Sequence, residues 1–257
     1  MRPTVIRLFL LCLIAILIFG SGEAKAAFSG PRAETASEPP TIVLGFVGGF
    51  IRHDDPNHSE VQLAERLRKE YSAGVVVETY SNHRGKKVYR RILELLDADH
   101  DGVLSSAERR SARIILYGHS WGASESVTLA RRLQRDGIPV LLVVQVDSIS
   151  KIGQDDQIIP SNVAQAANFF QEDGLLQGES EIRAADPAHT QIQGNFRFYY
   201  SGVPYNGTGY PWYARIFMKA HTQIESDPKV WNQVEKLIRA VLSNPMESGS
   251  VLAPQKP

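Results

Sequence analysis

Cysteine is almost absent from this sequence: Cys12 is the only one in 257 residues. One cysteine cannot form a disulfide within the chain, and Cys12 lies in an N-terminal apolar run of the kind that is removed on export. Small exported domains often depend on disulfides for stability. This chain must instead be held together by its hydrophobic core or by a bound metal ion.

An excess of charge of one sign and a long apolar run are also missing. The 28 Lys and Arg residues balance 28 Asp and Glu residues, so we do not expect nucleic acid as a partner. The apolar run from Leu8 to Gly20 has thirteen residues, whereas a membrane-spanning helix needs roughly 20. These absences exclude a polytopic membrane protein and favour a globular one, as does the 43% hydrophobic content.

The N-terminal run is typical of an export signal. Arg2 and Arg7 precede it, and Ala24-Lys25-Ala26 offers small residues for cleavage. We therefore predict a signal peptide at 1–26, a secreted or periplasmic protein, and no stable membrane anchor after cleavage. An uncleaved anchor is the alternative. The polar, proline-bearing segments 27–40 and 244–257 are predicted to be flexible, which leaves one domain at 41–243.

Within this domain, short β-rich runs alternate with amphipathic helical patterns. Strands are predicted at 41–46, 74–80, 113–117, 139–146 and 195–200, and helices at 59–71, 85–96, 123–135, 161–171 and 228–242. Alternation of this kind gives a parallel sheet with helices on both faces. The predicted fold class is therefore α/β, with a mostly parallel sheet of about five or six strands.

The third of these strands leads into the pentapeptide Gly118-His119-Ser120-Trp121-Gly122. This is the G-x-S-x-G pattern of a nucleophile elbow, in which a sharp strand-to-helix turn exposes the serine hydroxyl. Side chains two residues before and after the serine would collide with the backbone, and glycine removes them. The pattern predicts an activated serine, and a plain strand-to-helix turn is the alternative.

The elbow and the order of elements resemble the α/β-hydrolase superfamily over residues 41–243, in a compact version similar to the smallest lipases and cutinases. The resemblance implies cleavage of carboxylic esters through an acyl-enzyme on Ser120. A thioesterase or an acyltransferase with the same residues fits equally well. A non-catalytic binding protein on a hydrolase scaffold is the alternative from a different functional class.

The superfamily order of serine, acid and histidine indicates His221 as the base and Asp147 as the acid, since Asp147 directly follows the strand 139–146. His189 is the next candidate for the base. A buried structural histidine and a capping aspartate are the alternative interpretations of His221 and Asp147. Of the other histidines, His119 is expected to pack under the elbow, and His58 and His100 are expected in polar surface loops. Asp155 and Asp156 are the other possible acids.

The superfamily also implies an oxyanion hole made of backbone N–H groups. One is that of Trp121, and the second comes from Gly49 or Phe50 in the glycine-rich loop after the first strand. Aromatic residues precede His221 and either line a substrate pocket or belong to the core. They are Tyr205, Tyr210, Trp212, Tyr213 and Phe217. The polar stretch 173–193 is the predicted movable cover.

A second motif spans residues 97–108 and has the spacing of an EF-hand calcium loop. The predicted ligands are Asp97, Asp99, Asp101, the Val103 carbonyl and Glu108. Only four residues separate Glu108 from the elbow strand, so the outgoing helix must be short. This favours a structural calcium ion over a regulatory one, and a polar loop with a helix-capping box is the alternative.

We expect no organic cofactor, a small-molecule or lipid ester as substrate, and a monomer.

Overall fold

The computed structural model describes residues 39–205, 207 and 210–243. The expected signal peptide at 1–26, most of the segment 27–40 and the tail 244–257 lie outside these residues. Within the described ranges, no helix is both long enough and apolar enough to cross a bilayer.

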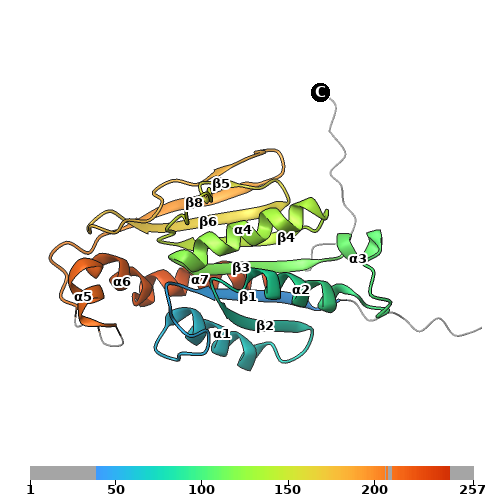
Figure 1. Cartoon of the computed structure of the whole chain (residues 1–257), viewed down its shortest axis with the longest axis horizontal. Helices are drawn as coiled ribbons and strands as arrows, with labels where there is room; N and C mark the ends of the chain where they lie inside the picture. The colour runs from blue at the N-terminus through green and yellow to red at the C-terminus, as the bar shows by residue number, and fades with distance from the viewer. Residues whose placement is uncertain (1–38, 206, 208–209, 244–257) are drawn as a thin grey trace, which may run out of the picture. The chain divides into compact units, whose positions relative to one another are not determined.

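The centre of the fold is a six-stranded sheet in the order β2-β1-β3-β4-β6-β8, and every neighbouring pair is parallel (Figure 1). This confirms the predicted α/β class. The strands are β1 (Thr41–Val47), β2 (Val75–Ser81), β3 (Arg113–His119), β4 (Val140–Val146), β6 (Val163–Gln171) and β8 (Gln191–Phe198). Because all strands run the same way, their carboxyl ends meet at one edge, where ligands bind in folds of this kind.

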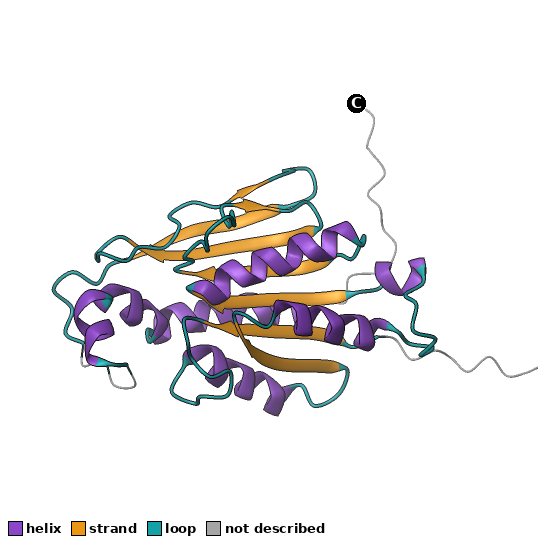
Figure 2. Ribbon diagram, in the orientation of Figure 1, coloured by secondary structure: helices purple, strands orange, loops and turns teal. Residues whose placement is uncertain are grey.

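Helices pack on both faces of the sheet (Figure 2). Two of them, α2 (Gly85–Leu96) and α4 (Trp121–Arg135), bury apolar residues in one core cluster, and α1 (Ser59–Glu70) and α7 (Pro228–Ser243) do so in a second cluster. Each of the two clusters contains fully buried leucines, such as Leu133 on α4 in the first and Leu67 on α1 in the second. Each such side chain contributes about 1.5–3 kcal/mol of burial free energy.

The helix predicted at 161–171 is wrong, because this segment forms strand β6. The sequence Val-Ala-Gln-Ala-Ala-Asn-Phe-Phe-Gln is rich in alanine, which favours a helix in isolation. In the fold it pairs with both β4 and β8, and residues 166–171 are buried throughout. A helix here would leave both neighbouring strands with unpaired backbone groups, so tertiary pairing overrides the local preference.

The remaining elements are short, and apart from α3 they were not predicted. They are α3 (Ser106–Arg110), α5 (Trp212–Phe217), α6 (Lys219–Glu225), β5 (Ile158–Ile159) and β7 (Arg183–Ala184), with β5 and β7 paired in a small second sheet. The predicted movable cover 173–193 contains β7 and the start of β8. Part of it is held in place, because the Glu179 N–H donates to the Ser148 carbonyl at 2.9 Å.

Candidate active site

The turn between β3 and α4 has the strained geometry that the elbow motif predicts. Ser120 has φ 56° and ψ −127°, a backbone conformation that costs a residue with a side chain about 1–3 kcal/mol. A Cβ on Gly118 would lie 2.6 Å from the Gly122 carbonyl carbon, and a Cβ on Gly122 would overlap the Phe46 carbonyl oxygen. Both glycines are therefore required by close backbone approach.

Ser120 is nearly buried, with 7% of its surface exposed. Its N–H donates to the Val146 carbonyl at 2.9 Å, which fixes the turn against the end of β4. On its other side lies Gly48, where a Cβ would come within 3.0 Å of the Ser120 Cβ. Sequence reasoning named Gly49 and Phe50 in this loop and missed Gly48, whose lack of a side chain permits the close approach.

Asp147 and His221 form a buried pair at the carboxyl end of β4. His221 Nδ1 lies 2.7 Å from Asp147 Oδ2, and the two side chains are 2% and 0% exposed. Asp147 is the first residue after β4 and has φ 45°, which turns its carboxylate toward α6, the helix that carries His221. The structure therefore brings together the acid and the histidine that the sequence indicated, 74 residues apart.

Three further donors orient the Asp147 carboxylate. Oδ2 accepts from Gln171 Nε2 at 2.9 Å, and Oδ1 accepts from the backbone N–H groups of Gln171 at 3.2 Å and Gly178 at 3.1 Å. Gly178 must be a glycine because a Cβ would collide with the Asp147 backbone. The sequence analysis missed both residues. No local signal marks them, since their role depends on β6 lying beside β4.

His119 packs beneath the site, as the sequence analysis expected. Its ring lies 4.5 Å from the His221 ring, and its Nε2 is 3.2 Å from the His221 carbonyl oxygen. Burial lowers the pKa of His119 well below its usual range, and the nearby His221 lowers it further. A neutral His119 that donates from Nε2 supports the backbone of His221. Because His119 is adjacent to Ser120 in the chain, this contact holds the backbone of His221 against the end of β3.

The alternative acids are occupied elsewhere. Asp156 is buried and accepts hydrogen bonds from the hydroxyls of Ser148 and Ser150. Asp155 is exposed, and its Oδ1 accepts from the Gln157 N–H at 3.0 Å in a local turn. Neither carboxylate contacts a histidine within the described part of the chain. The geometry therefore favours Asp147.

The alternative histidines also differ from His221. His189 is exposed and pairs with Asp186 at 2.7 Å. His100 lies in an exposed turn. The expectation that His58 lies in a polar surface loop is wrong, because it is 3% exposed and lies 3.4 Å from Glu225 at the end of α6. The reason is tertiary: the start of α1 packs against that helix, which the sequence did not predict.

The loop after β1 carries the candidate oxyanion donors. Among the described residues, neither the Gly49 nor the Phe50 N–H donates a hydrogen bond to the protein. The buried Asn82 holds this loop from below, because its Nδ2 donates to the Gly49 carbonyl at 2.5 Å and to the Val47 carbonyl at 3.3 Å. The third predicted donor, the Trp121 N–H, lies at the first turn of α4. Within the described part of the chain, the Gly49 and Phe50 N–H groups thus have no protein acceptor.

Aromatic residues surround the site unevenly. Phe50 is 95% exposed, and its ring meets the Trp121 ring edge-on at 5.8 Å. Tyr210 packs against His58, whereas Trp212 and Phe217 are more than half exposed. Tyr205 is partly buried, and the side chain of Tyr213 lies outside the described part of the structure. The run before His221 is therefore not simple core.

The calcium-loop motif folds into a compact turn between α2 and α3. Ligand oxygens of Asp97, Asp99 and Glu108 lie within 4.8 Å of one another. Asp97 Oδ1 is buried and has no hydrogen-bond partner in the described structure, while its Oδ2 accepts from the Gly102 N–H at 3.0 Å. Ser105 and Glu108 also form the capping box of α3. As predicted, α3 is short, with five residues.

Comparison with known proteins gives no sequence relative: no protein-family model matches the chain, and no curated protein matches it. Solved structures similar to it include a cutinase-like protein from Cryptococcus sp., which is 13% identical with a TM-score of 0.42 over 80% of this chain and 96% of that one. A thioesterase of the prodiginine pathway in Streptomyces coelicolor is 13% identical, with a TM-score of 0.37 over 86% and 100%. An acetyl xylan esterase is 9% identical, with a TM-score of 0.35 over 79% and 99%.

These similarities are too low to assign an activity. The sheet order, the parallel strands and the turn at Ser120 are properties of the chain itself, and they give the compact α/β-hydrolase fold.

Proposed function

We propose that this protein is a serine hydrolase that cleaves carboxylic esters through an acyl-enzyme on Ser120. The observation that carries the proposal is the combination of a strained, nearly buried serine with a buried Asp147–His221 pair at the same edge of the sheet. A serine hydroxyl is a weak nucleophile until a base accepts its proton, and this arrangement supplies the base and its orienting carboxylate.

In the proposed reaction, His221 Nε2 takes the proton of Ser120 as the hydroxyl oxygen attacks the ester carbonyl carbon. The resulting oxyanion is stabilised by the N–H of Trp121 together with that of Gly49 or Phe50. His221 then gives the proton to the leaving alcohol as the carbon–oxygen bond breaks. A water molecule repeats these steps on the acyl-enzyme and releases the acid. Asp147 holds the imidazole by its Nδ1–H throughout.

The surroundings of the serine favour esters with an apolar acyl or aryl group. Phe50 and Trp121, two of the residues with proposed oxyanion donors, form an aromatic pair, and exposed aromatic surface of this kind favours an apolar substrate group. A series of p-nitrophenyl esters of increasing chain length tests this preference. Replacing Phe50 with alanine should reduce kcat/KM for the longer esters more than for the acetate.

The primary test is labelling of the purified protein by a fluorophosphonate, which reacts with activated serines, with Ser120→Ala as the control. Labelling that the substitution abolishes supports the proposal. Replacement of Ser126 is the matched control and should leave the labelling unchanged. This serine is also buried on α4, but its hydroxyl donates a hydrogen bond to the Gly122 carbonyl. Labelling unaffected by Ser120→Ala, or none at all, would indicate a binding protein on this scaffold.

We further propose that the loop 97–108 binds one structural Ca²⁺. The unpartnered Asp97 Oδ1 and the grouping of Asp97 with Asp99 and Glu108 fit a hard cation that prefers oxygen ligands. Asp101 and the Val103 carbonyl complete the predicted set. The loop precedes β3, the strand that leads into Ser120, so binding should stabilise the fold. We expect Ca²⁺ to raise the melting temperature of the wild-type protein but not of Asp97→Asn. Equal melting curves in Ca²⁺ and in chelator would contradict this.

A further inference from the structure

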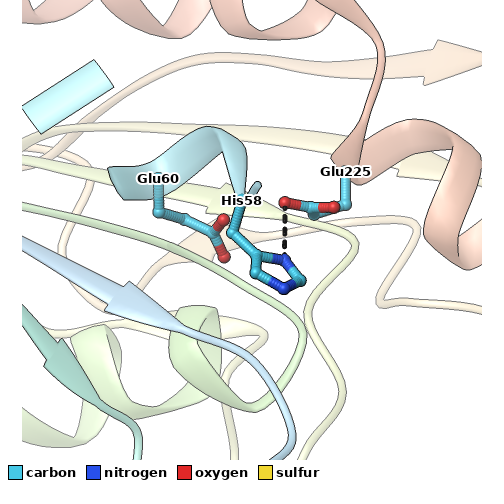
Figure 3. A group of neighbouring side chains, drawn as sticks. All are labelled: His58, Glu60 and Glu225. Carbon is cyan, nitrogen blue, oxygen red and sulfur yellow. Dashed lines mark ion pairs between the residues drawn. The ribbon is translucent and has the colours of Figure 1, made fainter. Parts of the chain in front are cut away.

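A second cluster of ionisable side chains lies where the start of α1 meets the end of α6. Figure 3 shows His58, Glu60 and Glu225 pointing toward one another. Their exposed fractions are 3%, 0% and 1%, and one ligand atom from each lies within 4.8 Å of the others. Neither the proposed serine chemistry nor the calcium loop uses these residues.

The cluster lacks the partners that buried polar groups normally have. Both carboxylate oxygens of Glu60 and Nδ1 of His58 are buried without a hydrogen bond in the described structure. His58 Nδ1 lies 3.4 Å from Glu225 Oε1, but the two are not aligned for a hydrogen bond. Leaving a buried polar group unpaired costs about 1–3 kcal/mol, and more for a charged one.

No positive side chain compensates these two glutamates. Within the described ranges, neither Glu60 nor Glu225 forms an ion pair with a lysine or an arginine. Two carboxylates without a cation in a buried space repel each other. Glu225 Oε1 has one protein donor, the Ser59 N–H at 2.9 Å, which orients it toward His58. The arrangement therefore has the donor atoms of a cation site.

We propose that His58 Nδ1, Glu60 and Glu225 bind one Zn²⁺ ion. Ligands held about 2.0–2.2 Å from a tetrahedral zinc ion are about 3.4 Å apart, which is the separation between His58 Nδ1 and Glu225 Oε1. Two carboxylates and a neutral imidazole balance the charge of the ion. One nitrogen and two carboxylates suit zinc, whereas calcium prefers six to eight oxygens.

The surroundings of His58 match those of a metal-binding histidine. Its other ring nitrogen, Nε2, faces Asp55 Oδ2 at 3.9 Å. Histidine ligands commonly direct their second nitrogen toward a carboxylate, and the Asp55 carboxylate lies on that side of the ring, beyond hydrogen-bond distance. The Tyr210 ring lies edge-on against the imidazole at 5.5 Å and shields it from solvent. Nδ1 is therefore the nitrogen available to the ion.

The proposed site would join segments on both sides of Ser120. His58 ends the loop that begins at Gly48, Glu60 lies in the first turn of α1, and Glu225 lies one helical turn beyond His221 on α6. The Glu60 backbone carbonyl also accepts from Tyr117 on β3 at 2.9 Å. The ion would thus tie this loop and the histidine helix to the sheet. The inference does not depend on the serine being reactive.

The test is a zinc titration of the purified, chelator-stripped protein, followed by dialysis, measurement of bound metal by mass spectrometry and melting curves. We expect about one zinc per chain and a rise in melting temperature of several degrees in the wild type. Glu60→Gln and Glu225→Gln should each retain at least about tenfold less zinc and show no such rise. Glu65→Gln, exposed on the same helix, is the matched control and should behave as wild type.

Asp97→Asn separates this site from the calcium loop, because it should keep the zinc-dependent rise in melting temperature. The proposal is overturned if the wild type retains no stoichiometric zinc, or if both glutamine variants retain it. If the wild type retains no zinc and the two glutamine variants melt at a higher temperature than the wild type, the two glutamates share a proton rather than a metal ion, and the proposal is wrong. Loss of zinc binding only in Asp97→Asn would place the ion in the calcium loop and would also overturn the proposal.

Discussion

Asp147→Asn is the substitution that most directly tests the proposed catalytic site. In the structure all four groups around the carboxylate are donors: His221 Nδ1, Gln171 Nε2 and the backbone N–H groups of Gln171 and Gly178. An asparagine offers one accepting oxygen and one NH₂ group. Whichever way its amide is oriented, the NH₂ faces two other donors, so two contacts are lost.

The size of the effect follows from these contacts. If the amide oxygen stays near the two backbone donors, the NH₂ group meets His221 Nδ1 and stabilises the wrong tautomer of the imidazole. Loss of the correct tautomer in serine hydrolases lowers kcat by about 10⁴-fold, or about 5 kcal/mol of transition-state stabilisation. In that orientation the Gln171 Nε2 donor is left unpaired, which also costs folding stability, at about 1–3 kcal/mol.

The assay is hydrolysis of p-nitrophenyl butyrate by wild type, Asp147→Asn and Asp156→Asn, with melting curves to confirm folding. Asp156 is a matched control because it is also buried in the loop after β4, but its partners are hydroxyls that can reverse their direction. We expect Asp156→Asn to stay within about threefold of wild type. A larger loss in Asp156→Asn than in Asp147→Asn would refute the assignment of the acid.

Three other substitutions probe the surrounding structure. Gly122→Ala should lower the unfolding free energy by about 3 kcal/mol or more, since the new Cβ meets the Phe46 backbone carbonyl, which cannot move aside. Gly174→Ala is the control: its Cβ makes only ordinary contacts, so this variant should melt as wild type. His119→Gln should reduce the loss of melting temperature between pH 7.5 and about pH 5. The folded state holds His119 neutral with a lowered pKa, so on acidification the unfolded chain takes up the proton first, and the stability of the wild type falls below about pH 6.5. An unchanged pH dependence of the melting temperature would count against a neutral His119. Asn82→Ala should lower kcat about tenfold with little change in KM, because it removes the hydrogen bond to the Gly49 carbonyl and loosens the proposed oxyanion loop. A change confined to KM in the same ester assay would argue against a role of Asn82 in holding this loop.

The features that the sequence predicted well depend on local chemistry. The elbow requires glycine on both sides of Ser120 because of contacts within the turn and with the adjacent strand, so the motif and its geometry agree. The alternation of strands and helices predicted the parallel sheet, and the apolar run 140–146 became the buried strand β4. The short spacing after Glu108 predicted the stunted helix α3.

The features that the sequence did not predict depend on contacts between distant segments. Residues 163–171 have a local preference for helix, and only pairing with β4 and β8 makes them a strand. Once β6 lies beside β4, Gln171 and Gly178 reach Asp147, and no pattern near either residue could indicate this.

The sequence by itself therefore determined the class of fold, the serine turn and the candidates for acid and base, because short-range sterics and periodicity encode them. Only the tertiary structure decided which groups orient Asp147, and that His58 and Glu60 meet Glu225. Ser59 and Glu225 are 166 residues apart, and the burial that leaves these side chains without partners arises only when α1 packs against α6. Burial and pairing are properties of the packed chain, and they set the electrostatics of both proposed sites.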